Sequence, residues 1–258
     1  MDLHIAGKTA LVCASTAGLG LASARALAEE GCRVVVVGRS AEKAERIAAE
    51  LGGGAFGLAA DLSAPSAAGA LADAVSQRAG GVDILVLNGP GPAPGQAADL
   101  DPEALHAAVA LVADNQVGLV RHTLPGMRER GWGRIISIGS SGVQAPIAHL
   151  APSNFARAAL AGYLKTLAAE VAADGVTVNS VLPGRIATDR LASLDATNAE
   201  RSGRTVEEVA AEARRAIPAG RYGRPEEFGA IVAFLAGAQA SFITGSAVRC
   251  DGGMIAGL

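Results

Sequence analysis

The chain is poor in aromatic residues, and this shortage bears on how its core can be packed. Phe, Trp and Tyr together make up 3% of the 258 residues, although hydrophobic residues as a whole reach 50%. A chain of this composition has enough apolar side chains for a sizeable core. Ala and Gly dominate it instead of aromatics, which suits helices packed closely against a parallel sheet.

Cysteines are equally few. The three of them, Cys13, Cys32 and Cys250, lie in or beside predicted strands and show no spacing typical of a metal site. We expect them to be small buried hydrophobic residues in a reducing cytoplasm, and we expect no bound metal.

Long apolar runs and an excess of basic charge are also missing. No run approaches the length needed to span a bilayer, and residues 1–4 do not begin the basic and apolar pattern of a signal peptide. The formal net charge of −3 provides no basic surface for nucleic acid or an anionic membrane. These absences predict a cytoplasmic protein that acts on a small-molecule substrate and binds neither nucleic acid nor a membrane.

Residues 9–39 predict one complete β-α-β unit. The apolar run 9–14 is too short for a helix and fits a buried strand. Residues 21–30 predict a helix that ends at Gly31, and residues 34–37 predict a second strand. We expect the right-handed crossover that such units adopt.

A turn of small residues joins the first strand to the helix. Gly18 and Gly20 let backbone N–H groups approach a diphosphate at the helix N-terminus, where the helix dipole favours negative charge. Ala14 stands where the first glycine of such a turn is usual, and alanine fits there if its φ stays negative. The turn therefore predicts a dinucleotide site formed by Ala14, Ser15, Thr16, Gly18, Leu19 and Gly20.

The residue after the second strand indicates which dinucleotide binds. An NAD site usually carries an acid there for the ribose 2′-hydroxyl, whereas this chain has Arg39 between Gly38 and Ser40. A guanidinium suits a 2′-phosphate, so the sequence favours NADP(H). The alternative is that Arg39 is only a solvated loop residue.

Strands and helices keep alternating to the C-terminus. Further strands are expected at 55–60, 84–87, 134–138, 176–182 and 247–250, and helices at 40–51, 65–79, 101–113, 122–129, 153–173 and 225–236. No repeat or linker interrupts this order. We therefore predict one domain over residues 1–258, an α/β Rossmann-type doubly wound parallel sheet of about seven strands with helices on both faces.

One segment, about 185–224, breaks the alternation. It follows the carboxyl end of a predicted strand, where ligands bind in open α/β sheets. Loops of this length are usually functional or mobile. We predict a substrate lid with one or two helices, of which 206–216 is the clearer.

Several motifs, in the right order and at the right separations, resemble those of the short-chain dehydrogenase/reductase family over nearly the whole chain. Residues 14–20 resemble its cofactor turn, with Ala14 in place of the first glycine. Asp61-Leu62 resembles the pair that contacts adenine. Asn88-Gly89 stands in the run that stabilises the central sheet, although Leu87 and Pro90 depart from the family pattern.

The resemblance extends to the C-terminal half. Asn115 stands where the family has a helix-kinking asparagine linked to its proton relay. Residues 242–245 and 251–253 match its C-terminal signature. Residues 183–188 match the segment that positions the nicotinamide carboxamide, which implies cofactor contacts from Pro183, Gly184, Ile186 and Thr188.

The chain departs from the family at the residues that carry the chemistry. Ser140 fits the family's serine, and the tyrosine that should follow thirteen positions later is Ser153. The lysine expected four positions after that is Arg157. Tyr163 lies nearly three helical turns beyond Ser153 and on another side, so it does not replace the missing tyrosine.

This departure matters because hydride delivery to a ketone leaves an alkoxide that needs a proton from a positioned acid. A lysine cation can lower the pKa of a tyrosine into a useful range. A serine hydroxyl is a far weaker acid, and arginine stays charged and shuttles protons poorly.

Three substitutes for the missing acid stay open. His149 has a suitable pKa and would lie in the loop at the mouth of the site, unless it is simply an exposed loop residue. Ser140 and Ser153 could orient a carbonyl while water supplies the proton, or they could be helix caps. Arg157 could bind a carboxylate, phosphate or enolate of the substrate, or form a salt bridge within the fold.

The sequence leaves three functions open. The first is an NADP(H)-dependent oxidoreductase that acts on a keto or hydroxy group with an atypical proton relay. The second is a non-redox enzyme on the same scaffold, such as a lyase, isomerase or cyclase, in which Arg157 and the serines stabilise an oxyanion. The third is a non-catalytic nucleotide-binding protein. The segment 183–188 favours the first, and the missing tyrosine favours the other two.

Two long helical stretches also predict self-association. The segments 101–129 and 153–173 carry alanine-rich faces that would permit close approach to a symmetry mate. The family resemblance implies the same arrangement, so we expect a homotetramer or homodimer.

Overall fold

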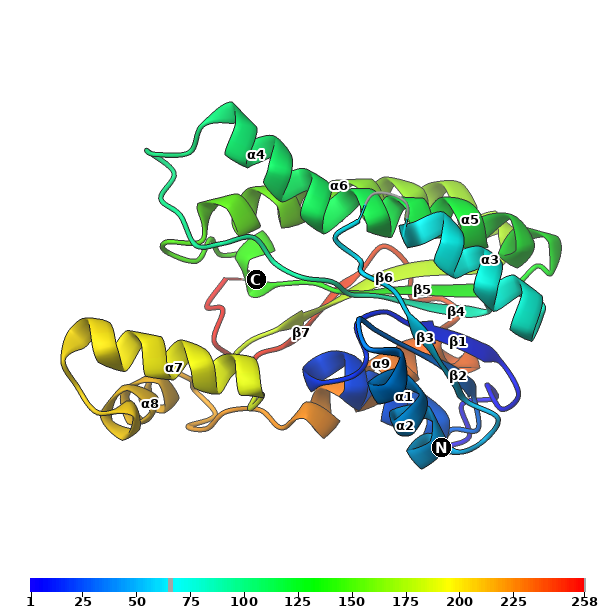
Figure 1. Ribbon diagram of the computed structural model, residues 1–258, viewed down its shortest axis with the longest axis horizontal. Helices are drawn as coiled ribbons and strands as arrows, with labels where there is room; N and C mark the ends of the chain where they lie inside the picture. The colour runs from blue at the N-terminus through cyan, green and yellow to red at the C-terminus, as the bar shows by residue number, and fades with distance from the viewer. Residues whose placement is uncertain (65–66, 258) are drawn as a thin grey trace.

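A seven-stranded parallel sheet forms the centre of the molecule (Figure 1). In this computed structural model, which describes residues 1–64 and 67–257, the strand order is β3-β2-β1-β4-β5-β6-β7. The strands are β1 (Thr9–Val12), β2 (Arg33–Gly38), β3 (Phe56–Ala59), β4 (Ile84–Leu87), β5 (Gly133–Ile138), β6 (Val176–Pro183) and β7 (Ala247–Cys250). The predicted doubly wound sheet is confirmed.

Helices cover both faces of this sheet in two layers (Figure 1). One face carries α1 (Gly18–Glu29), α2 (Ala41–Leu51) and α9 (Pro225–Ala236). The other carries α3 (Ala67–Ala79), α4 (Pro102–Val109), α5 (Asn115–Glu129) and α6 (Ala151–Val171). Alternate residues of a strand serve the two cores, because Val34 and Val36 face the first layer of helices whereas Val35 and Val37 face the second.

Two helices begin earlier than the sequence pattern predicts. Helix α1 begins at Gly18, three residues before the predicted start, so both glycines of the turn belong to its first helical turn. Helix α6 begins at Ala151 instead of 153. The predicted first residue of α3, at position 65, lies outside the described residues.

Helices α4 and α5 form one helical run interrupted by a π-turn at Ala110–Asp114. Asn115 follows this turn directly and is buried, with its Nδ2 donating to the carbonyls of Leu62 (2.7 Å) and Ala64 (3.0 Å). A π-turn is a widened turn that shifts the register of a helix. The structure therefore places a π-turn directly before Asn115, the position at which the resemblance implies a kink.

The predicted lid contains two helices, α7 (Asp189–Ser202) and α8 (Val206–Arg215), which project from the body of the molecule (Figure 1). A buried carboxylate holds this segment together: Asp195 accepts from the Tyr222 hydroxyl at 2.8 Å and from Arg185 at 3.4 Å. Among the described residues, no helix is long and apolar enough to cross a membrane.

The position of α1, and with it the position of the glycine turn, depends on its contact with α9. A Cβ added at Gly229 of α9 would lie 2.5 Å from the Ala22 carbonyl oxygen of α1, so only glycine permits this approach. Helices α1 and α9 also both pack on the sheet. A wider spacing between them would therefore shift α1 on the sheet.

Gly229→Ala should therefore lower the free energy of unfolding by about 1–3 kcal/mol, the usual cost of overpacking a close contact. Urea unfolding measures this change. Ala230→Ser is the control on the exposed side of the same helix and should change stability by less than about 0.5 kcal/mol. Equal stability of Gly229→Ala and the native protein would contradict the tight α1–α9 contact.

Candidate functional site

A cavity of about 400 Å³ opens at the edge of the sheet where the strands have their carboxyl ends. Four connections meet there: the glycine turn after β1, the loop after β4, the loop after β5, and the segment from the end of β6 into α7. The residues that line it are Ala17, Gly18, Leu19, Asn88, Gly89, Ile138, Gly139, Ser140, Ser141, Ile147, Leu150, Ser153, Arg157, Pro183, Gly184, Ile186, Thr188, Asp189, Arg190, Leu191 and Leu194.

The glycine turn adopts its tight form with a strained alanine. Ala14 has φ +47°, which contradicts the expectation of a negative φ at this position. The turn needs a left-handed residue here, and an L-alanine in that region costs roughly 1–2 kcal/mol. Gly20 packs directly beneath it, since an added Cβ would lie 2.4 Å from the Ala14 carbonyl oxygen.

Ser15 and Thr16 use their side chains within the fold. The buried Ser15 hydroxyl donates to the Val12 carbonyl (2.7 Å) and accepts from the Val37 amide (2.9 Å), which ties β1 to β2. Thr16 packs on Gly38, where an added Cβ would lie 2.4 Å from the Thr16 methyl group. Their side chains therefore shape the turn, and their backbone remains as the part that can face a nucleotide.

Arg39 follows β2 and Asp61 follows β3, and these two strands are neighbours in the sheet. Arg39 is exposed and lies near Asp61. The pKa of the Asp61 carboxyl is below its ordinary value, mainly because Ser63 donates to it and secondarily because Arg39 is close. The next residue, Leu62, is buried, and Asn115 holds its carbonyl. Asn115 therefore supports the chain after β3 and is not among the residues that line the cavity.

The loop after β4 and the segment after β6 complete the nucleotide side. Asn88 Nδ2 donates to the Ala14 carbonyl at 3.4 Å, which links the ends of β1 and β4, and Gly89 follows it along the wall. Pro183, Gly184 and Ile186 line the cavity. The Thr188 hydroxyl accepts from the Leu191 amide and so caps α7, while its methyl group faces Gly18.

Ser140, Ser153 and Arg157, the three residues singled out for chemistry, all line this cavity. Ser140 follows β5 and accepts from the Gly142 amide at 3.1 Å, so it does cap a short 3-10 turn. Ser153 lies inside the first turn of α6 and makes no cap hydrogen bond. Its hydroxyl instead accepts from Arg157 Nε at 3.3 Å.

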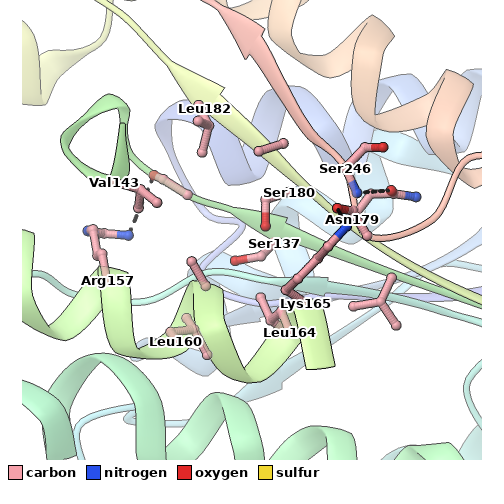
Figure 2. Close-up of a pocket in the computed structure, with 15 residues that line it drawn as sticks. Ser137, Val143, Arg157, Leu160, Leu164, Lys165, Asn179, Ser180, Leu182 and Ser246 are labelled. Atoms are coloured by element: carbon pink, nitrogen blue, oxygen red, sulfur yellow. Dashed lines mark hydrogen bonds between the residues drawn. The ribbon is translucent and has the colours of Figure 1, made fainter. Parts of the chain in front are cut away.

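Arg157 is anchored to the end of β5. Its Nη1 points at the carbonyls of Ile138 and Gly139, each at 3.5 Å, at one end of a smaller cavity beneath α6 (Figure 2). Burial lowers the pKa of Arg157, and the nearby charge of Arg190 lowers it further. Among the described residues, Arg157 forms no salt bridge, so the alternative of a salt bridge within the fold is excluded there.

His149, the remaining acid–base candidate, lies in the loop between Ile147 and Leu150, which both line the cavity. His149 is exposed, with a left-handed backbone (φ +61°), and is not among the lining residues. Of the two tyrosines, Tyr163 lies on α6 and packs against the core, and Tyr222 donates to Asp195 in the lid. The described lining of the cavity contains neither tyrosine nor lysine.

Sequence reasoning missed Asp189, Arg190, Leu191 and Leu194, which line the cavity from α7. Their position in the sequence could have indicated this role, because they directly follow Thr188. A helix that begins there turns its first residues toward the site. Elsewhere in residues 1–64 and 67–257, no three His, Cys, Asp or Glu side chains are grouped as a metal site.

Comparisons with known proteins agree with this geometry. A family profile described as enoyl-(acyl carrier protein) reductase matches residues 13–255. The 3-oxoacyl-(acyl-carrier-protein) reductase of Vibrio cholerae is 35% identical over 254 residues, which cover 98% of this chain and 99% of that protein. The D-beta-hydroxybutyrate dehydrogenase of Cupriavidus necator is 33% identical over 97% of this chain and 98% of its own.

Solved structures give the same result. L-sorbose reductase of Gluconobacter frateurii, complexed with NADPH and L-sorbose, matches with a TM-score of 0.93 and 32% identity, over 100% of both chains. Actinorhodin polyketide ketoreductase with NADPH matches with a TM-score of 0.90 and 34% identity, over 96% of this chain and 97% of that one. The chain belongs to the short-chain dehydrogenase/reductase family of NAD(P)-dependent oxidoreductases that act on keto and hydroxy groups.

Ser15→Ala tests whether this side chain supports the turn. The variant leaves the Val37 amide and the Val12 carbonyl without their buried partner, which should cost about 1–3 kcal/mol of unfolding free energy. Thermal and urea unfolding check this value, with the exposed Ser76→Ala of α3 as the control expected to change little. A variant of native stability would show that the Ser15 hydroxyl is free for a ligand.

Proposed function

We propose that this protein is an NADP(H)-dependent oxidoreductase that acts on a keto or hydroxy group of a small molecule, with an atypical proton relay. One observation carries the proposal: the glycine turn, the segment 183–188 and the pair of Ser140 and Ser153 open into a single cavity. In a hydride-transfer enzyme these are the parts that must meet, since cofactor and substrate react in contact.

The chain offers a fitting cradle for the cofactor. Helix α1 begins beside the cavity with no side-chain cap and no acid in its first turn, so its first amide groups are available for a diphosphate. Asp61 and Leu62 are assigned to adenine, Arg39 to the 2′-phosphate, and Asn88, Gly89, Pro183, Gly184, Ile186 and Thr188 to the nicotinamide half. When bound, NADPH supplies a hydride. L-sorbose reductase, the similar protein solved with NADPH, supports this choice.

The proton relay is the atypical part. Ser153 and Arg157 stand at the positions of the family's tyrosine and lysine. We assign to Ser140 and Ser153 the task of orienting the carbonyl oxygen, while a solvent water delivers the proton that the alkoxide needs. Arg157 stays charged, because even a lowered arginine pKa leaves its proton in place near neutral pH. It stabilises the developing negative charge and orients Ser153 through their hydrogen bond.

The lid assignment forms part of the same proposal. We assign the segment of about 185–224 to substrate enclosure within a single domain of residues 1–258. Its first helix contributes Leu191 and Leu194 to the cavity wall, and Asp195 ties it to Arg185 and Tyr222. An anchored lid of this kind can hold the substrate in the cavity.

A second candidate is a non-redox enzyme on the same scaffold. The described lining of the cavity contains three serines and two arginines but no tyrosine, a set suited to stabilising an oxyanion. A screen of NADPH consumption on carbonyl compounds, run beside a cofactor-binding titration, separates the two. Binding of NADPH without turnover of any carbonyl would favour the non-redox enzyme or a nucleotide-binding protein.

NADPH should bind more tightly than NADH, because Arg39 is free of an ion pair within the described chain and can contact the 2′-phosphate. A charge-assisted contact is worth about 1.5–3 kcal/mol. Fluorescence titration of both nucleotides against the native protein and Arg39→Ala measures this difference. Arg46→Ala, on the exposed side of α2, is the control. Equal dissociation constants for NADPH and NADH would contradict the assignment.

Ser153→Tyr with Arg157→Lys should restore a phenol acid and its cation one helical turn apart on α6. General acid catalysis contributes about 10²–10⁴-fold, so the native protein should reduce simple activated ketones slowly and the double variant faster. The assay is NADPH oxidation with diketones and β-keto esters. Ser153→Tyr alone is the control and should gain less, because it lacks the lysine cation.

The opposite pattern would overturn the assigned relay. A native protein already as fast as ordinary reductases and slowed by the exchange would show that another group supplies the proton. His149→Ala then tests the remaining histidine candidate, whose imidazole lies outside the cavity lining.

We also propose that the chain forms a homodimer or homotetramer through α4–α5 and α6. Two of the alanines in the predicted contact face, Ala108 and Ala168, belong to the chain's own core and are unavailable. An exposed strip nevertheless remains on α6, with Phe155 48% exposed beside Ala158, Ala159, Gly162 and Ala169. Sedimentation at micromolar concentration should give a dimer or tetramer, weakened by Phe155→Asp. A native monomer would exclude this assembly.

A further inference from the structure

Two arginines from different helices meet at Gly91, two residues after the cavity-lining Gly89. A Cβ added at Gly91, in the loop after β4, would lie 3.2 Å from an Arg190 guanidinium nitrogen and 3.8 Å from an Arg157 guanidinium nitrogen. Arg157 comes from α6, and Arg190 comes from the first turn of α7. Both side chains line the cavity that contains Ser140 and Ser153.

Neither of these two arginines has an acidic partner within residues 1–64 and 67–257. Arg185, a few residues before Arg190, pairs with the buried Asp195 at 3.4 Å, so the same segment does pair an arginine where the fold needs it. The nearby charge that acts on Arg157 is the like charge of Arg190. Two guanidinium groups placed together without an anion repel each other, and an anionic ligand would remove that repulsion.

We propose that Arg157 and Arg190 form a clamp for a carboxylate of the substrate, so that the substrate is a keto or hydroxy acid. This inference rests on the proposed oxidoreductase function. Guanidinium groups bind carboxylates in a bidentate manner that an ammonium group cannot reproduce. This difference gives a physical reason for an arginine at position 157.

The charge of the cavity favours a carboxylate over a phosphate dianion. Its charged lining residues are Arg157, Arg190 and Asp189, which leave a single excess positive charge. One carboxylate neutralises that excess, whereas a dianion would exceed it. The lining also includes the apolar side chains of Ile147, Leu150, Leu191 and Leu194, which suit the carbon chain of such an acid.

The clamp also sets the direction of the substrate. With the carboxylate on the arginines, the carbonyl would lie toward Ser140 and Ser153, which line the same cavity. NADPH would supply the hydride to the carbonyl carbon and water the proton to its oxygen, and the products would be a hydroxy acid, NADP⁺ and hydroxide. The arginines keep their protons throughout.

The test uses binding to the full-length protein saturated with NADP⁺, so that no turnover is needed. Calorimetry measures the affinities of 3-oxobutanoate, 4-oxopentanoate and 5-oxohexanoate, each beside its neutral methyl ester. At least one acid should bind about ten-fold more tightly than its ester, as expected for a charge-assisted contact. Arg190→Gln should remove this preference and leave ester affinity unchanged. Arg190→Lys should recover only part of it.

Arg201→Gln is the matched control, because it removes the same charge from the last turn of α7. It should leave the preference for the acid intact. Inorganic phosphate, titrated in the same way, separates the two possible anions, and tighter binding of phosphate than of every acid would overturn the carboxylate assignment.

Two further results would also overturn the clamp. One is an equal affinity of every acid and its ester in the native protein. The other is a loss of NADP⁺ affinity in Arg190→Gln with the acid preference unchanged, which would assign the arginines to the cofactor phosphates. Failure of the proposed function is distinguishable: it would appear as binding of NADPH without turnover of any carbonyl compound. The acid and ester titrations need no turnover, so they would still report on the arginine pair.

Discussion

The site depends on the parallel register of the central strands. Ala10, Leu11 and Val12 of β1 pair with Ile84, Leu85 and Val86 of β4, β4 pairs in turn with β5, and β5 pairs with β6. Parallel pairing brings the carboxyl ends of these strands to one edge, and each end releases a connection that lines the cavity. A shift of one residue in any pair would turn its side chains to the other face and misplace its connection.

Arg157 connects this framework to the chemistry. Its side chain extends from α6 (Figure 2), and its guanidinium reaches the Ile138 and Gly139 carbonyls at the end of β5 and the Ser153 hydroxyl. These contacts place a fixed positive charge beside Ser153 in the cavity. A fixed charge can hold an anion and polarise a carbonyl, but it cannot pass a proton near neutral pH. The proposed function and the proposed carboxylate clamp both follow from this property.

Much of the fold could be predicted from the sequence, because short apolar runs such as 84–87 and caps such as Ser40 carry local signals. Three features could not. Ala14 adopts a positive φ because the turn geometry overrides the preference of alanine. The π-turn before Asn115 leaves no mark in the hydrophobic period. Arg157 and Arg190 come close only because the lid folds back toward α6, and the local sequence of the lid does not specify that path.

Isotope transfer is the most direct test of the central claim that this cavity performs hydride transfer without a tyrosine acid. The native protein is incubated with NADPH deuterated at C4 and the panel of keto acids, and the products are analysed by mass spectrometry. The account predicts a hydroxy acid with one deuterium on the carbinol carbon, formed by the native protein with Ser153 and Arg157 in place. Consumption of a keto acid with no deuterium in any product, while NADPH stays bound and unoxidised, would contradict it.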